Sequence, residues 1–324
     1  IPCFLHGAGI RARHVENAPS RSYNHGFDSF TRGLDKALVL SLNRRMSVLT
    51  IQSRVASGYV GNSAAVPCLQ QFGLDCIAID TVHLSNHPAH GSHRGRRVPA
   101  GDVADLLDGV AERGLLRTVD VVHSGYLGAT DTGPVVLDTV DAVKRAAPMT
   151  PYCLDPVIGD NGTLYVEPDL VTFFRTKALP AADLVLPNLF EAECLLGGPL
   201  SGVDDAVAAA RALQDKGPAR VVVTGVETPS GLMTVGADGP EIWCVETPRV
   251  DVASSGAGDV FAALILGCLF GRESGFNTAL EVACSFVFEL LTTTKALGKP
   301  DIALVQSLHL VADFTSNFKA KSIL

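Results

Sequence analysis

From Met46 onward, short apolar runs typical of buried strands alternate with longer segments of helical periodicity, and this alternation constrains the fold more than any other feature. The strand-like runs are residues 48–51, 76–79, 119–124, 151–155, 184–187 and 221–224. The helix-like segments are residues 62–72, 103–113, 134–147, 169–178, 190–196, 203–216, 260–271 and 275–295. This pattern indicates βαβ units, and therefore an α/β fold with helices on both faces of a mainly parallel sheet. Residues 232–245 predict an antiparallel hairpin at the sheet edge, because Asp238-Gly239 is a typical turn.

Residues 1–45 lack the alternation and differ in charge from the rest of the chain. Up to Met46 the sequence has seven Lys or Arg but only three Asp or Glu, whereas the whole chain has a net charge of −8. An Arg-rich, acid-poor segment is compatible with an organelle transit peptide, and equally with a non-native extension. We expect residues 1–45 to be a disordered or targeting extension that is dispensable, and residues 46–324 to form one domain.

Composition excludes several classes of function. A chain with net charge −8 is not expected to bind nucleic acid as its main role. The longest apolar run, residues 260–271, is too short to cross a bilayer, so no membrane association is expected. The eight cysteines are scattered without a C-x-x-C pair, which indicates reduced thiols packed as small apolar groups. We therefore expect a cytoplasmic protein, with organelle import through residues 1–45 as the alternative.

A glycine-rich turn precedes the apolar helix that is expected near residue 260. It reads Ser254-Ser255-Gly256-Ala257-Gly258-Asp259. Backbone N–H groups at a helix N-terminus bind anions, and glycines allow close approach of a phosphate. Asp259 could then take the proton from a hydroxyl group that attacks the phosphate, which is the outline of a phosphoryl-transfer site. The alternative is an ordinary turn in which Asp259 only complements the helix dipole.

Polar residues follow five of the predicted strands, where open α/β sheets bind their ligands. They are Ser53, Tyr126, Asp155, Asn188 and Thr224. Asp155, Asp160 and Glu191 could hold Mg²⁺ directly or through water, with Asn188 behind them. Otherwise Glu191 is a first-turn acid and Asp160 a loop residue. A shared ligand crevice at this edge of the sheet is the favoured interpretation.

Four histidines at positions 83, 87, 90 and 93 lie in a segment that also contains three arginines. Their spacing resembles a zinc site only loosely, and no cysteine accompanies them. We interpret residues 83–97 as a mobile basic loop that closes over an anionic ligand.

These motifs together resemble the pyridoxal kinases of the ribokinase-like superfamily over residues 46–324. The segments with the resemblance are Gln52-Ser53-x-Val55, residues 58–65 and 81–87, Ser124-Gly125-Tyr126, residues 155–160, Pro187-Asn188-x-Phe190-Glu191 and Gly256-Ala257-Gly258-Asp259. The resemblance implies a three-layer ribokinase-like sandwich with a mainly parallel sheet and an antiparallel edge. It also implies ATP-dependent phosphorylation of the 5′-hydroxymethyl group of pyridoxal, pyridoxine and pyridoxamine.

The resemblance further implies roles for individual residues. The vitamer would contact Ser53, Val60, Val82, Leu84, His87, Tyr126 and Asp259. ATP and its cations would be bound by Asp155, Asn188, Glu191, Thr224, Gly256 and Gly258, with Mg²⁺ at Asp155, Asp160 and Glu191 and K⁺ as the expected monovalent ion. The backbone N–H groups of residues 256–258 would hold the migrating phosphoryl group, and Asp259 would be the base. Such kinases are usually homodimers.

Three residues depart from the family pattern. Leu186 and Ala257 stand where members often have threonine, and Pro88 replaces a threonine that is common after Ser-Asn-His. Altered cation dependence or vitamer preference is therefore expected. The rival interpretations are a hydroxymethylpyrimidine kinase on the same fold, a non-catalytic vitamer-binding protein and a dinucleotide-dependent oxidoreductase. The last is disfavoured because Phe261 occupies the third glycine position of G-x-G-x-x-G.

Overall fold

The computed structural model describes residues 46–253 and 255–323. The expectations for residues 1–45 and for Ser254 lie outside the described residues. The strands are β1 (Ser47–Val55), β2 (Asp75–Leu84), β3 (Gly95–Arg97), β4 (Val119–Ser124), β5 (Tyr152–Leu154), β6 (Gly159–Asp160), β7 (Thr163–Leu164), β8 (Leu184–Val185), β9 (Arg220–Thr228), β10 (Gly231–Asp238), β11 (Glu241–Thr247) and β12 (Lys321–Ser322). The α-helices are α3 (Asn62–Gln71), α4 (Ala100–Glu112), α5 (Thr132–Ala146), α6 (Pro168–Phe173), α7 (Leu179–Ala181), α8 (Leu189–Leu196), α9 (Gly202–Gln214), α10 (Ala257–Leu266), α11 (Phe276–Ala296) and α12 (Leu304–Ser307).

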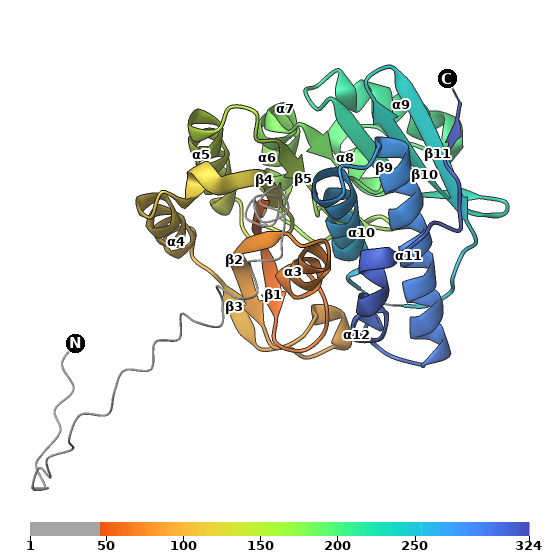
Figure 1. The fold of residues 1–324 in the computed structure, drawn as a ribbon, viewed down its shortest axis with the longest axis horizontal. Helices are drawn as coiled ribbons and strands as arrows, with labels where there is room; N and C mark the ends of the chain where they lie inside the picture. The colour runs from red at the N-terminus through yellow and green to blue at the C-terminus, as the bar shows by residue number, and fades with distance from the viewer. Residues whose placement is uncertain (1–45, 254, 324) are drawn as a thin grey trace, which may run out of the picture. The chain divides into compact units, whose positions relative to one another are not determined.

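The described residues form a ten-stranded sheet in the order β12-β11-β10-β9-β8-β5-β4-β1-β2-β3 (Figure 1). The strands from β9 to β2 are mutually parallel. β10, β11 and β12 extend one edge in antiparallel fashion, and β3 pairs antiparallel to β2 at the other edge. The chain passes from β1 to β2 on one side and returns to β4 on the other, so β1 and β4 flank a topological switch point, where such sheets bind ligands.

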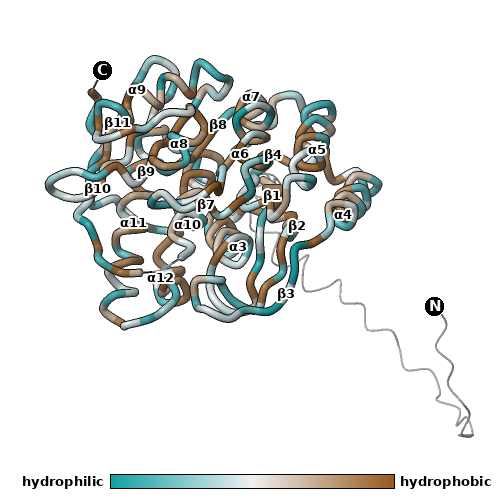
Figure 2. Tube along the Cα trace, turned by 180° about the vertical axis from the view of Figure 1, so that it is seen from behind, coloured by the Kyte–Doolittle hydropathy of each residue, from teal (hydrophilic) through white to brown (hydrophobic). Residues whose placement is uncertain are grey.

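Both faces of the sheet are buried, which explains the near-continuous apolar strands. In β1, Leu49 and Ile51 belong to the core beneath α4, α5, α8 and α9, whereas Val48 belongs to the core beneath α3, α10 and α11. Figure 2 shows the brown, hydrophobic part of the trace concentrated in the interior around β1, β2 and β8. The expected α/β fold, with a mainly parallel sheet between two helical layers and an antiparallel edge, is confirmed.

The structure differs from the predicted elements where local signals compete. The segment expected as one helix over residues 169–178 is α6, followed by a π-helical stretch, Phe174–Ala178, and the short α7. The apolar run after the glycine turn likewise ends in a π-helical stretch, Gly267–Gly271. β3 and β12 were not predicted, because their exposed polar residues lack the apolar alternation of a buried strand.

The segment interpreted as a mobile loop is partly regular. β2 continues through Leu84, and the chain returns as β3, so residues 85–94 form the tip of a hairpin. A 3₁₀ turn, Pro88–His90, shapes this tip. We call residues 85–94 the hairpin tip below. In the described part of the chain, none of the helices combines the length and the apolar character that crossing a membrane requires.

Candidate active site

The glycine-rich turn forms the N-terminus of α10, as the sequence predicts. Gly256 is the N-cap residue with φ 98°, a left-handed conformation that favours glycine. A Cβ atom on Gly256 would lie 1.9 Å from the carbonyl oxygen of Tyr59, so this position also brings two backbones into close contact. Among the described residues no side chain caps α10, and a Cβ atom on Gly258 would meet none of their atoms within 4 Å. The turn therefore presents helix N–H groups beside free space, as an anion site requires.

Asp259 lies in the first turn of α10 and is only partly exposed. Burial raises the pKa of its carboxyl group to about 6, although hydrogen bonds from the backbone N–H groups of Gly61 and Asp259 itself act in the opposite direction. Cys68 of α3 also lies near this carboxylate, and burial raises the pKa of its thiol to about 12. At neutral pH Asp259 is thus mainly ionised, next to a neutral thiol, and is able to accept a proton.

The residues expected to contact a vitamer come from neighbouring strands. Gly61 is packed so closely against Ser53 that a Cβ atom would lie 2.5 Å from the Ser53 hydroxyl oxygen. Val82 is buried in β2, and the Thr81 hydroxyl beside it donates a 2.6 Å hydrogen bond to the carbonyl oxygen of Tyr126. Leu84 pairs with Val55 of β1. Val60, partly buried, lies in the turn between β1 and α3 that also contains Gly61.

The hairpin tip contacts the glycine-rich turn. The Ser255 hydroxyl lies 3.1 Å from Nδ1 of His87. Nε2 of His90 lies 3.5 Å from Oδ1 of Asp301. Burial, followed by the nearby His90, lowers the pKa of His87, so this ring is neutral at pH 7. The structure therefore places His87 beside the glycine-rich turn, residues 255–259, which is called the proposed phosphate turn below.

Asn188 and Glu191 form a capping box at the start of α8. Both carboxylate oxygens of Glu191 accept backbone hydrogen bonds, Oε1 from Ile158 at 2.9 Å and Oε2 from Asn188 at 2.9 Å. The Asn188 side chain donates to the carbonyl oxygen of Gly159 at 2.8 Å. These bonds fasten the segment after β5 to α8. Thr224 joins the group because it forms a parallel bridge with Asn188.

Three carboxyl groups interact in this part of the site. Burial raises the pKa of Asp155 well above its ordinary value, and the negative charges of Glu191 and Asp259 raise it further. Burial also raises the pKa of Glu191. Asp160 is exposed, and its carboxylate accepts from the backbone N–H of Asn161 at 2.9 Å. Within residues 46–253 and 255–323 no three His, Cys, Asp or Glu side chains are arranged to hold a metal ion, so the metal and zinc interpretations gain no geometric support.

Sequence reasoning assigned no role to a set of buried polar residues on the α3 side of the sheet. These are Thr50 and Gln52 in β1, Asn62 at the start of α3 and His123 in β4, all at most 2 % exposed. The signal for them was their position: each strand residue is polar where the pattern of a doubly buried strand calls for an apolar side chain. They lie at the switch point, beside the residues described above.

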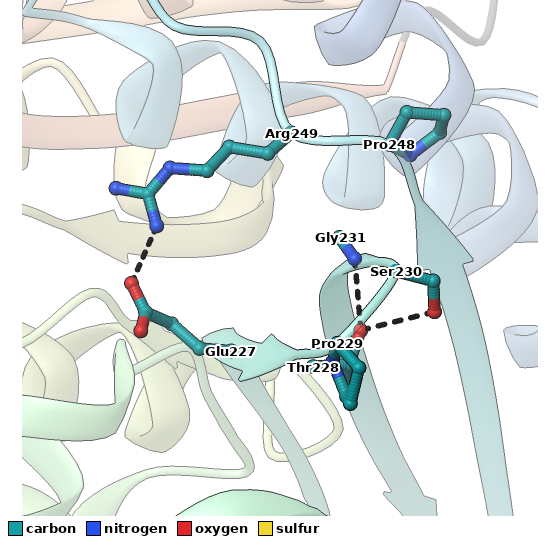
Figure 3. A pocket seen from close by; sticks show the side chains of 7 residues that line it. All are labelled: Glu227, Thr228, Pro229, Ser230, Gly231, Pro248 and Arg249. Carbon is teal, nitrogen blue, oxygen red and sulfur yellow. Dashed lines mark hydrogen bonds and ion pairs between the residues drawn. The ribbon is translucent and has the colours of Figure 1, made fainter.

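A pocket of about 350 Å³ lies at the end of the β9–β10 hairpin (Figure 3). Its lining residues are Glu227, Thr228, Pro229, Ser230, Gly231, Pro248 and Arg249. Arg249 pairs with Glu227, and the Thr228 hydroxyl accepts a hydrogen bond from the backbone N–H of Gly231. Glu227 lies in the same strand as Thr224, and Arg249 precedes Gly256 by one short segment. The chain therefore leads from this pocket to the glycine-rich turn along the segment between Arg249 and Gly256.

The raised pKa of Asp259 has a consequence for stability. Because this carboxyl group binds a proton more tightly in the folded than in the unfolded chain, its contribution to the free energy of unfolding is greatest at low pH. That contribution is lost as pH rises from about 4 through about 6. We compare the melting temperature of Asp259→Asn with that of the ligand-free wild type. The variant's melting temperature minus that of the wild type should be larger at pH 7.5 than at pH 5. Asp251→Asn, at an exposed aspartate, is the control, and its melting temperature should follow that of the wild type at every pH. The prediction would be contradicted if the melting-temperature difference between Asp259→Asn and the wild type stayed constant with pH.

The fold and the site define the class of protein. A carboxylate and open backbone N–H groups at a helix N-terminus, at the ligand-binding edge of an α/β sheet, are the parts of a small-molecule phosphotransferase. A family model described as phosphomethylpyrimidine kinase matches residues 64–304. A pyridoxal kinase of Rubrobacter xylanophilus is 41 % identical over 80 % of this chain and 91 % of its own length. One from Leifsonia xyli is 36 % identical over 86 % of this chain and 100 % of its own length.

Solved structures agree in fold. A pyridoxal kinase from Leishmania donovani in complex with ADP and pyridoxine is 27 % identical, with a TM-score of 0.81, over 86 % of this chain and 99 % of that one. A Bacteroides thetaiotaomicron protein described as a putative phosphomethylpyrimidine kinase has the same TM-score at 24 % identity over 86 % and 98 % of the two chains. The chain belongs to the pyridoxal kinase family, and it also matches the phosphomethylpyrimidine kinase family model.

Proposed function

We propose that this protein transfers the γ-phosphoryl group of ATP to the 5′-hydroxymethyl group of pyridoxal, pyridoxine and pyridoxamine. One observation carries the proposal: Asp259 stands at the N-terminus of α10 and accepts a hydrogen bond from Gly61, which packs against Ser53. The base and the proposed vitamer-binding residue thus meet at one turn. Relatives named as pyridoxal kinases, one of them solved with ADP and pyridoxine, support this substrate class.

In the proposed reaction the alcohol oxygen attacks the γ-phosphorus, the bond from phosphorus to the β–γ bridging oxygen breaks, and ADP leaves. Asp259 accepts the hydroxyl proton as the new bond forms. The backbone N–H groups of Gly256, Ala257 and Gly258 are proposed to stabilise the charge of the migrating group, since they lie at the positive end of α10, which no side chain of the described residues caps. Ala257 retains the backbone donor despite lacking the hydroxyl that is common in the family.

The vitamer ring is placed between Ser53 and Val60 on one side and Val82, Leu84, His87 and Tyr126 on the other. The hairpin tip is proposed to cover it, because His87 already contacts Ser255 of the phosphate turn. Exclusion of water by this cover would strengthen the electrostatic stabilisation of the transferring group.

The carboxylates fit a divalent cation with phosphate ligands. Asp155 is buried beside two further carboxyl groups, and a cation would relieve the repulsion that raises its pKa. When bound, Mg²⁺ would neutralise phosphate charge. Its first ligands would be Asp155 and phosphate or water oxygens, since the oxygens of Glu191 already accept backbone hydrogen bonds. Asp160, Glu191 and Asn188 are then proposed to lie around the cation without binding it directly. Thr224 is proposed to bind a phosphate or K⁺.

The nucleoside end of ATP is proposed to extend toward the pocket of Figure 3. Glu227 lies three residue steps beyond Thr224 along β9, which corresponds to about 10 Å. That span suits a nucleotide whose phosphates lie at Thr224 and Gly256. Residues 46–324 are proposed to suffice for this chemistry; a homodimer, a cytoplasmic location and a dispensable segment 1–45 remain predictions from the sequence.

Phosphorylation of hydroxymethylpyrimidine is the second candidate, favoured by the description of the matched family model. Purified protein should be tested for ADP formation with pyridoxal, pyridoxine, pyridoxamine and hydroxymethylpyrimidine, with Mg²⁺ and with either K⁺ or Na⁺. We expect kcat/KM for at least one vitamer to exceed that for the pyrimidine by about tenfold or more, since a site that hydrogen-bonds one ring rejects another. Activity should disappear when EDTA removes divalent cations.

The Asp259→Asn protein, prepared in parallel, controls for contaminating kinases. Preference for the pyrimidine would replace the proposal with the second candidate. Binding of vitamers without any ADP formation under all conditions would instead indicate a non-catalytic binding protein.

A further inference from the structure

Four buried polar side chains form one hydrogen-bond network across the switch point of the sheet. The Thr50 hydroxyl donates to Oδ1 of Asn62 at 3.1 Å. The same hydroxyl oxygen accepts from Nε2 of Gln52 at 2.9 Å and lies 3.3 Å from Nδ1 of His123. The amide nitrogen of Asn62 in turn donates to Oδ1 of Asp80 at 2.7 Å.

The donor and the acceptor of every hydrogen bond in this network follow from the chemistry of the groups. Nδ2 of Asn62 faces the Asp80 carboxylate and the carbonyl oxygens of Ile79 and Gln52, which only accept, so the amide cannot be reversed. Oδ1 of Asn62 therefore takes the single hydrogen of the Thr50 hydroxyl. His123 must then donate from Nδ1, and it is able to do so as a neutral ring because burial lowers its pKa to about 4.

Asn62 is the residue after Gly61 and the first of α3. It binds β1 through Thr50 and the carbonyl oxygen of Gln52, and β2 through Ile79 and Asp80. Gly61 has φ 54°, pairs with Arg54 in an antiparallel bridge and packs against Ser53. Its backbone N–H donates to the Asp259 carboxylate. The amide of Asn62 thus fixes the peptide that contacts both Ser53 and Asp259.

We infer that Asn62 is a positioning residue for phosphoryl transfer: oriented by Thr50 and Asp80, it holds the backbone of Gly61 against Asp259 and Ser53. This inference rests on the proposed role of Asp259 as the base. A buried side chain with four partners on two strands leaves the Gly61 peptide little freedom, and general-base catalysis requires that the carboxylate be held within hydrogen-bond reach of the substrate hydroxyl. Asn62 itself does not touch the substrate in this arrangement.

Two substitutions at Thr50 test the inference with matched destabilisation. Thr50→Val keeps the shape but removes the hydroxyl that orients Asn62, whereas Thr50→Ser keeps the hydroxyl and loses a methyl group. We expect both to lower the melting temperature, and only Thr50→Val to lower kcat, by about tenfold or more, with KM for ATP little changed. Asn62→Ala should have a larger effect of the same kind if it folds.

Thr150→Val is the control for a buried hydroxyl elsewhere. Thr150 is buried and donates to the carbonyl oxygen of Val119 at 3.0 Å, where β4 begins and just before β5, at the strand ends opposite to the candidate site. Its replacement should lower the melting temperature without lowering kcat. Circular dichroism should first show that both Thr50 variants are folded under the assay conditions. Equal kcat values for the folded Thr50→Val and Thr50→Ser proteins would overturn the inference.

A double-mutant cycle shows whether Thr50 and Asn62 act through Asp259. Thr50→Val combined with Asp259→Asn should be no slower than Asp259→Asn alone, because the base that the hydroxyl helps to position is then absent. Additive losses would overturn the inference while leaving the proposed base intact. Wild-type turnover in Asp259→Asn alone would refute the base itself, and with it the positioning role.

Discussion

Asp259→Asn is expected to lower kcat by about 10²–10⁴-fold, which corresponds to roughly 3–5 kcal/mol of activation free energy. The attacking group is a primary alcohol, whose proton must be accepted as the phosphorus–oxygen bond forms. Asparagine has the size of aspartate, and its Oδ1 still accepts the hydrogen bond from Gly61, but it is not a base. The folded structure and the affinity for ATP should therefore change little, whereas the vitamer should bind moderately less well.

Single-turnover phosphorylation and equilibrium ATP binding separate these effects. Asp251→Asn is the matched control, because Asp251 is an exposed aspartate in the segment that leads to the same turn. It should retain wild-type turnover. If Asp259→Asn itself turned over within about threefold of the wild type, the carboxylate would serve only as a partner of the α10 dipole.

Gly256→Ala is expected to impair both stability and activity. The new Cβ would meet the Tyr59 carbonyl oxygen at 1.9 Å, and residue 256 would still need φ near 98°. A strained backbone of this kind costs about 1–3 kcal/mol, and relief of the clash would move either α10 or the turn that contains Gly61. Because a displacement of about 1 Å can cost 10²-fold in rate, kcat should fall by that order.

Gly258→Ala provides the contrast within the same turn. Gly258 lies inside α10 without a positive φ, and the new Cβ atom would meet no heavy atom of the described residues within 4 Å. The melting temperature of this variant should therefore equal or exceed that of the wild type, since alanine is the better helix former. If the phosphoryl group occupies that open space, kcat/KM for ATP should still fall. Unchanged melting temperature and kcat in Gly256→Ala would contradict the proposed close packing of the two turns.

The alternation of strand and helix segments predicted the layered fold, and the antiparallel hairpin at residues 232–245 is confirmed as β10 and β11. The boundaries were less accurate where segments are polar. β2 runs five residues beyond its predicted end, because its later residues pair with β1 and β3 without presenting a continuous apolar run. Backbone pairing with a neighbouring strand stabilises such residues, and that pairing has no signature in the local sequence.

The candidate site was likewise predicted from the sequence only in part. The glycine turn with Asp259 was visible in the sequence, because the left-handed conformation of Gly256 and an acid in the first turn of a helix are local requirements. For Glu191 the sequence left two alternatives open, a metal ligand and a first-turn acid. As a carboxylate near Asp155 it suggested a metal ligand, but in the fold its oxygens accept from the backbones of Ile158, Gly159 and Asn188.

The sequence by itself determined the periods of the strands and helices, the turn at Gly256 and the presence of a carboxylate at the start of α10. Only the tertiary structure decided that Gly61 donates to Asp259 and that Asn62 fixes Gly61. These contacts join residues that are far apart in the chain, and they depend on the strand order that places β1 between β2 and β4. Periodicity and turn preferences act over a few residues, whereas the order of strands is set by how whole layers pack.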